Sequence, residues 1–429
     1  MRRLEPRFLE ALDRAQEERR RTVLLIAGPR KAGMRTFLKQ VLPDALSVDF
    51  SNPSVTADAE DAPHTFLARY SASPVLLLLN AHLAPRLAAV AASHAGEACE
   101  PAGAMAPKII VMASELGLET LLGETPASDA MRAFRLRTLA ESEITGAGGD
   151  FLERLAKLDF PSVLSHDENN RDLILGEAMR GGYPGCRDGS ADVRHDFFHA
   201  LIREICRLDL PKAAVIRSTM TLRKVYRMTG AASGEILNVA EIAKVLGIGR
   251  PLAARCLFAL EALHLVDSIP VWTHSADFER SIKRPRHVVT DSGWLCGLLG
   301  FCSTDPATLS AQHLSVVERL LYGWTYAQLA SLVDNQPHLR LSHFGLRTGL
   351  SIDFLIEDLN AGSLTAILVR PKERIDESDF APLKRFRALL EEKRFPDVQS
   401  LQTVILYCGQ SARRFEGLGA AVPLAFFWR

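Results

Sequence analysis

Residues 22–41 of the chain read TVLLIAGPRKAGMRTFLKQV, an apolar run that passes through two glycines into a helical pattern. The run Val23–Ala27 ends at Gly28, and Gly33 closes a short loop before the helix-like residues. A buried strand, a glycine-bounded loop and a helix make up the arrangement in which backbone N–H groups curl around phosphate. The stretch therefore predicts a phosphate-binding loop, or P-loop, within a parallel α/β domain.

The loop departs from the working pattern, G-x-x-x-x-G-K-[ST], at the two positions that follow Gly33. Met34 stands where a lysine reaches the outer phosphates, and Arg35 stands where a hydroxyl group holds Mg²⁺. Arg35 does not replace the lysine, since one helical step turns its side chain about 100° away. Thr36 is one position late for magnesium. The candidate nucleotide-binding residues are Gly28, Arg30, Lys31, Gly33, Arg35 and Thr36.

The second half of a nucleotide-hydrolysing site is an acidic residue at the end of a neighbouring apolar strand. The candidate strand is SPVLLLLNAHLAP, residues 73–85, which reads Asn80-Ala81 where Asp-Glu is expected. Asn80 carries no charge to hold Mg²⁺, and Ala81 cannot polarise water. Hydrolysis is therefore not expected, and we assign neither catalytic residues nor a metal site.

The composition is that of a globular chain with no overall preference for a polyanion. Its 429 residues exceed what one core usually organises, and 51 basic residues balance 51 acidic ones. Seven scattered cysteines without a CxxC pair favour idle thiols in a reducing cytoplasm. The amino terminus lacks the apolar segment of a secretory signal, and no apolar run is long enough to span a bilayer. We expect a cytoplasmic protein without membrane contact.

The pattern of apolar runs divides the chain into three predicted domains. The predicted domains span residues 1–150, 151–300 and 301–429. In the first, short continuous apolar runs such as Val23–Ala27 suit strands covered on both faces of a parallel sheet. The other runs of this kind lie at residues 45–50, 75–79 and 108–113. The third domain alternates strand-like runs with a basic helix, which predicts a second α/β module.

The middle domain is predicted to be helical and contains one arrangement typical of DNA-binding proteins. Residues 236–272 show two amphipathic segments around a Gly-Ile-Gly turn and then a strand-like run, which predicts a helix-turn-helix with a wing-like hairpin. Arg250 and Arg255 are the only cationic candidates on the second helix. Helices that read DNA usually carry more polar side chains. DNA binding and packing against protein therefore both stay open.

The order of several segments along nearly the whole chain resembles one protein family. The segments are GPR…G, LLLLNAH, KIIVMAS, MRAFRLRTLAESE, GGYP, LNVAEIAKVLGI, KRPRHVVTDSGWLCGLLG, SIDFLIED and AVPLAFFW. Together they are similar to the bacterial and archaeal AAA+ ATPases whose carboxy-terminal half is the domain of unknown function 4143. The resemblance implies a sensor 1-like role for Ser114, and it matches Arg132 and Glu143 to positions of the family pattern.

The same resemblance implies a winged helix in the middle of the chain and a module similar to PD-(D/E)xK nucleases at its end. Such nucleases hold a divalent metal with carboxylates from a helix, a strand and a Glu-x-Lys motif. Glu318 and Asp353 match the first two positions, but the third reads Leu368-Val369-Arg370. The metal cage is therefore incomplete, and we interpret Asp353 as a structural carboxylate.

These departures predict a catalytically degenerate AAA+-like protein that serves as a binding or regulatory scaffold and requires no cofactor. A protein is the expected partner, and the oligomeric state is not predicted. Two alternatives stay open. In one, the loop backbone, its arginines and Lys31 hold ATP or ADP weakly without turnover. In the other, residues 236–272 bind DNA with help from the basic stretches 278–287 and 384–387.

Overall fold

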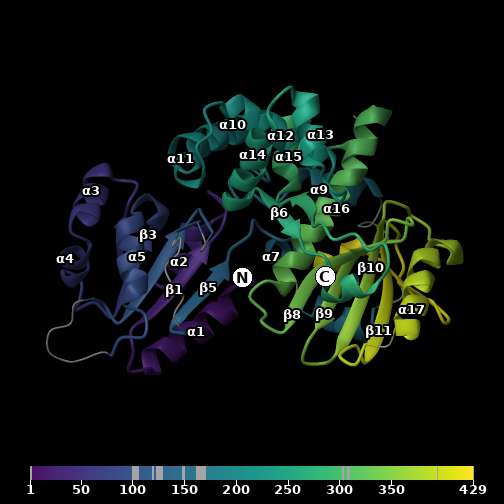
Figure 1. Cartoon of the computed structure of the whole chain (residues 1–429), viewed down its shortest axis with the longest axis horizontal. Coiled ribbons are helices and arrows are strands. Elements are labelled where there is room, and N and C mark those ends of the chain that lie inside the picture. Colours follow the sequence, from purple (N-terminus) through teal and green to yellow (C-terminus); the bar gives the residue numbers. More distant parts are fainter. Residues whose placement is uncertain are drawn as a thin grey trace.

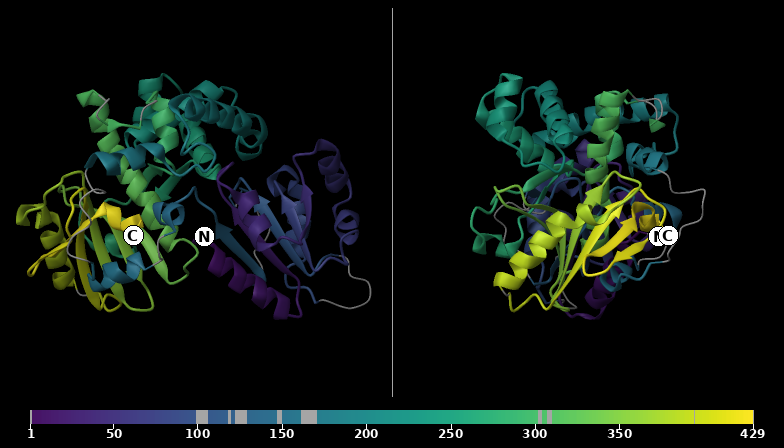
Figure 2. Two further views of the ribbon diagram at one scale, coloured as in Figure 1. Left: turned by 180° about the vertical axis from the view of Figure 1, so that it is seen from behind. Right: turned by 90° about the vertical axis from the view of Figure 1, so that its right-hand side faces the viewer.

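The computed structural model describes residues 2–98, 106–117, 120–121, 129–146, 150–160, 171–301, 304–306, 310–393 and 395–428. Figure 1 shows two α/β parts side by side, with a mainly helical part above and between them. We call the part that contains the predicted P-loop and strands β1–β5, within residues 22–135, the P-loop domain, and the other α/β part contains the carboxy-terminal sheet; the rear view in Figure 2 agrees. None of the helices in the described stretches combines the length and the apolar character needed to cross a membrane.

The first sheet consists of five parallel strands in the order β2-β3-β4-β1-β5. The strands are β1 (Thr22–Ala27), β2 (Leu46–Asp49), β3 (Val75–Leu79), β4 (Ile109–Ser114) and β5 (Met131–Arg135). The helices around it are α1 (Glu5–Glu17), α2 (Met34–Val41), α3 (Pro53–Asp61), α4 (Pro63–Ala68) and α5 (Pro85–Ser93). Two apolar clusters cover the two faces of the sheet. The predicted parallel α/β architecture is confirmed, and it is consistent with a P-loop AAA+ domain.

Helix α1 fixes the loop-bearing side of the sheet through an apolar stripe. Phe8, Leu12 and Ala15 recur at helical spacing and are buried. The Phe8 ring meets Phe37 of α2 and Phe134 of β5 edge-on, with a centroid distance of 5.6 Å in both cases. The packing of α1 thereby holds α2, and with it the glycine loop, against the strands.

Most of the chain between the two sheets is helical. Its helices are α7 (Glu141–Thr145), α8 (Phe151–Lys157), α9 (Arg171–Arg180), α10 (Ala191–Leu208), α11 (Leu210–Ala213), α12 (Thr219–Ala231), α13 (Val239–Leu246), α14 (Arg250–Ala262), α15 (Ser292–Leu299) and α16 (Ala311–Val333). Ser190 and Ser218 begin α10 and α12, because their hydroxyl groups accept the free N–H groups of Val193 and Thr221. Figure 1 places α10 and α11 on the side of this part that faces the P-loop domain.

Helices α13 and α14 are the two helices predicted around the Gly-Ile-Gly turn, and Gly247 ends the first of them at φ +63°. Strand β6 (Val266–Ile269) follows, but it pairs with β7 (Arg286–Val289), outside the segment 236–272 that was predicted to contain the hairpin. Pro270 directly after β6 has no N–H group for a strand ladder, so the chain leaves the sheet before it returns. The winged-helix assignment stays a prediction.

The second sheet has six strands in the order β12-β13-β11-β10-β9-β8 and mixes parallel with antiparallel pairs. Its elements are β8 (Leu339–Gly345), β9 (Ser351–Asp358), β10 (Ser363–Arg370), α17 (Ala381–Lys393), β11 (Ser400–Tyr407), β12 (Arg413–Phe415) and β13 (Gly419–Pro423). One apolar cluster joins a face of this sheet to the helical part, and it includes Trp324 of α16 and Phe354 of β9. A continuous core therefore crosses residue 300, where a domain boundary is predicted.

Buried polar contacts join the P-loop domain to the rest of the molecule. Arg135 and Arg137, at and just beyond the end of β5, both donate to the Asp267 carboxylate of β6. The Tyr326 hydroxyl of α16 donates to the same carboxylate at 2.8 Å. The Asn335 side chain accepts the Arg135 backbone N–H at 2.9 Å and donates to its carbonyl at 3.1 Å. These contacts hold edge strand β5 against the helical part.

Residues 270–285, between β6 and β7, run beside the edge strand β8. The Trp272 N–H donates to the His343 carbonyl at 2.8 Å, and the His343 N–H donates to the Pro270 carbonyl at 2.9 Å. The Ile282 N–H donates to the Gly345 carbonyl at 2.9 Å. The segment 270–285 is thus hydrogen-bonded to β8 of the second sheet.

Candidate functional site

The glycine loop between β1 and α2 needs its two glycines for its own conformation. Gly33 lies in the left-handed region at φ +97°, which side-chain-bearing residues rarely adopt. A Cβ atom on Gly28 would lie 2.1 Å from the Leu136 carbonyl oxygen. The Gly28 N–H also donates to the Ser114 carbonyl at 3.1 Å. These backbone requirements explain both glycines whether or not the loop still binds phosphate.

The three residues after Gly33 differ in their burial and in their contacts. Met34 is buried in the apolar cluster of α1 and α2, where its side chain contributes to the core. Arg35 is exposed and its Nη2 atom lies 2.5 Å from Oδ2 of Asp49. Thr36 is exposed. A lysine at position 34 would have to place its charge in an apolar core, which is costly.

Arg30 of the loop forms a buried, bidentate ion pair. Its Nε and Nη2 atoms donate to the two carboxylate oxygens of Asp209, at 2.7 and 2.6 Å. Both side chains are buried. Burial would lower the pKa of the Arg30 guanidinium, but Asp209, Glu115 and Glu204 raise it above its usual value. Bidentate pairs of this kind are the strongest hydrogen bonds that arginine forms.

His82 adds a second contact to Asp209 and lies near the ends of β3 and β4. It lies in the short helix η1 (Ala81–Leu83) and is buried. Its Nε2 atom lies 2.9 Å from Oδ1 of Asp209, and its Nδ1 atom lies 3.2 Å from Oε2 of Glu115. Burial raises the pKa of Glu115, and the nearby His82 and Arg30 only partly offset it. Burial would also raise the pKa of Asp209, but hydrogen bonds from Arg30 and His82 lower it.

Lys31 connects the loop to helix α10. Its Nζ atom lies 2.8 Å from Oε2 of Glu204 and 5.9 Å from the centre of the Phe197 ring. Glu204 also lies 3.4 Å from Nη1 of Arg30. Both loop cations are therefore bonded to carboxylates of the helical part. Carboxylates accept the same charge-assisted hydrogen bonds as phosphate oxygens.

We call Arg30, His82, Glu115, Glu204 and Asp209 the loop cluster. The sequence analysis assigned only its arginine. Glu115 directly follows β4, and His82 lies three residues after the end of β3. The carboxyl ends of parallel strands meet at one edge of a sheet, so these positions were a usable signal. Glu204 and Asp209 lie far along the chain at the end of α10, and no local pattern marks them.

Asn80 ends β3 in a conformation that its residue type tolerates well. It lies in the left-handed region at φ +55°, which asparagine and aspartate adopt more readily than most residues. Its Nδ2 atom donates to Oδ1 of Asp49 at 2.7 Å, and its Oδ1 atom accepts from Nη2 of Arg30 at 3.4 Å. The amide therefore bridges the loop arginine and the end of β2.

The positions matched to the family pattern have local structural partners. The Ser114 hydroxyl is buried and donates to the Leu116 carbonyl at 2.8 Å. Arg132 is exposed. Glu143 accepts the backbone N–H of Arg3 at 2.7 Å and the N–H of Ala140 at 3.0 Å. Among these, Glu143 serves to anchor the amino terminus near the loop.

The nuclease-like positions also have structural partners. Asp353 accepts the Val369 N–H at 2.8 Å, and its carboxylate lies 3.4 Å from Arg370 and 3.7 Å from Arg286. Burial raises the pKa of Asp353. Leu368 is buried in the core between the sheet and α17. The Glu318 side chain lies outside the described residues. The nuclease-like assignment stays a prediction.

The comparison with protein families matches one model, a domain of unknown function (DUF8612), over residues 172–305. This span runs from α9 to just beyond α15 and covers less than half of the chain. The matched family is not the domain of unknown function 4143, so the comparison does not support that part of the resemblance. No curated protein matches the chain.

Two kinds of solved structure are similar to the chain at low identity. The RuvB Holliday junction branch migration motor of Thermotoga maritima has 14% identity over 62% of this chain and 89% of its own, with a TM-score of 0.29. A signal transduction ATPase with numerous domains and a tetratricopeptide repeat sensor, from Pyrococcus horikoshii, has 9% identity over 75% and 45%, with a TM-score of 0.22. The assignment of the fold therefore rests on the strand order and the glycine loop.

Proposed function

We propose that the chain is a non-hydrolysing AAA+-like protein that acts as a binding or regulatory scaffold, with a protein as its partner. The observation that carries this proposal is the buried bidentate pair between Arg30 of the glycine loop and Asp209 of the helical part. Met34 and Asn80-Ala81 add to it, because they supply neither a phosphate-binding lysine nor an acidic metal ligand.

The loop cluster gives a physical reason for weak nucleotide binding. A triphosphate that used Arg30 or Lys31 would have to take them from Asp209 and Glu204. Breaking a buried ion pair costs about 3–5 kcal/mol, and each 1.4 kcal/mol is a tenfold change in affinity. Competition of Asp209 for Arg30 would therefore weaken binding through that arginine by about two to four orders of magnitude. The more exposed pair of Lys31 with Glu204 adds less.

Titration with a fluorescent ATP or ADP analogue and Mg²⁺ is expected to show no saturable binding below about millimolar concentration. ATP turnover is expected to stay at the level of a no-protein blank. The reason is that the loop cations are bonded internally and no carboxylate follows β3 in sequence where Mg²⁺ would need one. Equilibrium fluorescence and phosphate release measure the two quantities.

Two loop variants make this test decisive. Gly33→Asp places a carboxylate in the loop but strains the backbone at φ +97°, so Lys31→Ala is measured in parallel. Micromolar binding in the wild type that both variants abolish would support the nucleotide switch instead of the scaffold. Turnover that either variant abolishes would contradict the loss of hydrolysis.

A second candidate function, DNA binding, is favoured by the surface between α10 and α12. A cavity of about 320 Å³ there is lined by Arg203, Arg207 and Arg223. Arg255 of α14 lies nearby and donates to the Val215 carbonyl, just before α12 begins. Guanidinium groups bind phosphate well, and several positive charges close together on a surface attract polyanions such as DNA.

If DNA binds at this surface, the double variant Arg207→Ala/Arg223→Ala is expected to weaken duplex retention at low salt. The slope of log affinity against log salt is expected to fall by about one for each lost phosphate contact. Arg19 is an exposed arginine after α1, and Arg19→Ala is the matched control. It should leave both the duplex retention at low salt and the slope unchanged. Salt-dependent fluorescence anisotropy measures the slope, and equal slopes in all three proteins would exclude this surface.

A further inference from the structure

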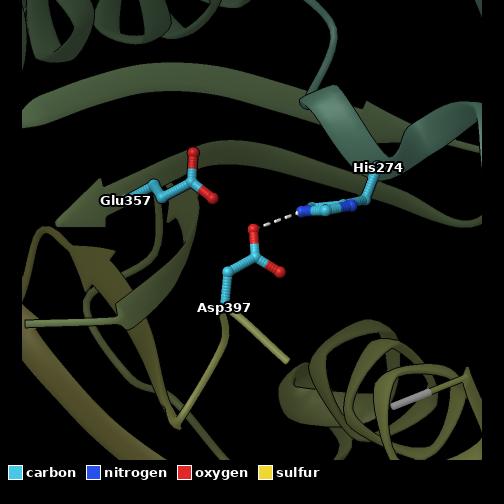
Figure 3. Close-up of side chains that lie close together, drawn as sticks. All are labelled: His274, Glu357 and Asp397. Carbon is cyan, nitrogen blue, oxygen red and sulfur yellow. Dashed lines mark hydrogen bonds and ion pairs between the residues drawn. The ribbon is translucent and has the colours of Figure 1, made fainter. Parts of the chain in front are cut away.

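Three side chains with metal-binding atoms converge beside the second sheet, far from the loop cluster in the sequence. His274 lies in the short helix η2 (Thr273–Asp277), Glu357 lies on β9, and Asp397 lies between α17 and β11. One ligand atom from each lies within 4.8 Å of the other two. Figure 3 shows the two carboxylates and the imidazole pointing towards a common space.

Glu357 is the unusual member of this group. The residue is only 6% exposed. Arg340 lies directly opposite it on β8, but among the described residues no ion pair joins the two side chains. Nε1 of Trp272 donates to the Glu357 carboxylate at a long 3.5 Å. A buried carboxylate without a positive partner is costly, so this site favours an added cation.

His274 is held in an orientation that suits a ligand. Its Nε2 atom lies 2.8 Å from Oδ2 of Asp397, and its Nδ1 atom lies 3.6 Å from Oδ2 of Asp277. The ring packs on Phe395 and Trp272, with centroid distances of 4.5 and 5.0 Å. If Nε2 binds a metal, Nδ1 faces Asp277, and a carboxylate on that side of the ring can help to hold its orientation.

We propose that His274, Glu357 and Asp397 bind one divalent transition-metal ion, with Zn²⁺ as the best match. One imidazole nitrogen and two carboxylate oxygens are ligands that Zn²⁺ accepts, and three protein ligands leave one tetrahedral position for water. Bonds of about 2.1 Å put tetrahedral ligand atoms roughly 3.4 Å apart, so small side-chain rotations suffice. Ca²⁺ and Mg²⁺ fit less well, because they prefer six or more oxygen ligands.

The ion would tie the segment between β6 and β7 to the second sheet. His274 belongs to that segment, whereas Glu357 and Asp397 belong to the sheet and its connections. The proposal assigns a metal where the sequence analysis assigned none, and it is independent of the state of the glycine loop. A failure of the scaffold proposal would leave it unaffected.

The test uses the full chain, stripped with EDTA and dialysed, and titrated with Zn²⁺ by isothermal calorimetry. One ion per chain and a rise in the thermal unfolding temperature are expected for the wild type. His274→Ala and Glu357→Gln are expected to remove both effects, and Asp277→Asn to weaken binding about tenfold. Glu391→Gln, an exposed carboxylate on α17, is the matched control and should bind like the wild type.

Trp272 provides a second readout that also locates the ion. Co²⁺ bound at the three residues is expected to quench part of the tryptophan emission, and Trp272→Phe should lack that part, because the indole contacts both His274 and Glu357. Absence of Zn²⁺ binding to the wild type would overturn the proposal. Binding of unchanged affinity in both His274→Ala and Glu357→Gln would overturn it as well, because the ion would then lie elsewhere.

Discussion

Replacement of Asp209 by alanine is expected to lower the free energy of unfolding by about 3–5 kcal/mol, the usual cost of removing one partner of a buried ion pair. The change leaves the Arg30 guanidinium buried without its two shortest hydrogen bonds, and it removes one of the two carboxylates that contact His82. Equilibrium urea unfolding followed by far-UV circular dichroism measures the loss. The midpoint of the unfolding transition of the P-loop domain should move to a lower urea concentration.

Two further variants separate the effect of charge burial from that of a lost contact. Arg30→Met/Asp209→Leu removes both charges, and we expect it to recover most of the stability, since apolar replacements of buried pairs are often neutral. Arg69→Ala breaks the exposed pair with Asp58, and we expect a far smaller effect on the free energy of unfolding because solvent screens that pair. An Asp209→Ala effect as small as that of Arg69→Ala would contradict the assigned role of the loop cluster.

The second large effect is expected for Asp267→Asn, which removes the carboxylate shared by Arg135, Arg137 and Tyr326. We expect a loss of about 3–5 kcal/mol near neutral pH, because two arginines lose their shared buried partner. The Tyr326→Phe variant removes only one hydrogen bond and should cost about 1 kcal/mol. Thermal or urea unfolding measures the loss of stability in each of the two variants.

The pH dependence of the Asp267 contribution has a definite sign. Burial would raise the pKa of Asp267, but the charges of Arg135 and Arg137 lower it well below the usual carboxyl value. A carboxylate with a lowered pKa in the folded state stabilises the fold above the unfolded-state pKa of about 3.9 and loses that contribution as the pH falls further. The difference between wild type and Asp267→Asn should therefore narrow below about pH 4. A constant difference down to pH 2 would contradict this assignment.

Local patterns were sufficient to predict four strands of the first sheet and the glycine loop, but the fifth strand, β5 (Met131–Arg135), was not predicted because its two arginines break the apolar run. The run Val23–Ala27 is buried on both faces of a parallel sheet, which is why it is continuously apolar. Residues 236–272 contain only the first strand of the predicted hairpin, because the chain turns away at Pro270 and β6 pairs with β7 beyond that segment. Strand pairing across such a detour leaves no periodic signal in the sequence.

The loop cluster could be predicted only in part, for a physical reason. Arg30 belongs to a motif with fixed spacing, so its position followed from the pattern of the loop. Asp209 meets Arg30 because the end of α10 lies beside the glycine loop, where Glu204 also contacts Lys31. Ion pairs between distant segments depend on how whole elements pack, and a single sequence does not encode that in any local spacing.

The contacts of Asn335 and of residues 270–285 have a consequence for how other chains can attach. An edge strand with free N–H and C=O groups is a template on which a foreign strand can be added. On β5 the amide of Asn335 already satisfies both backbone groups of Arg135, and on β8 the segment around Trp272 bonds to His343. Strand addition at these two positions would first have to displace an internal partner, so another chain meets side chains there and not an open backbone.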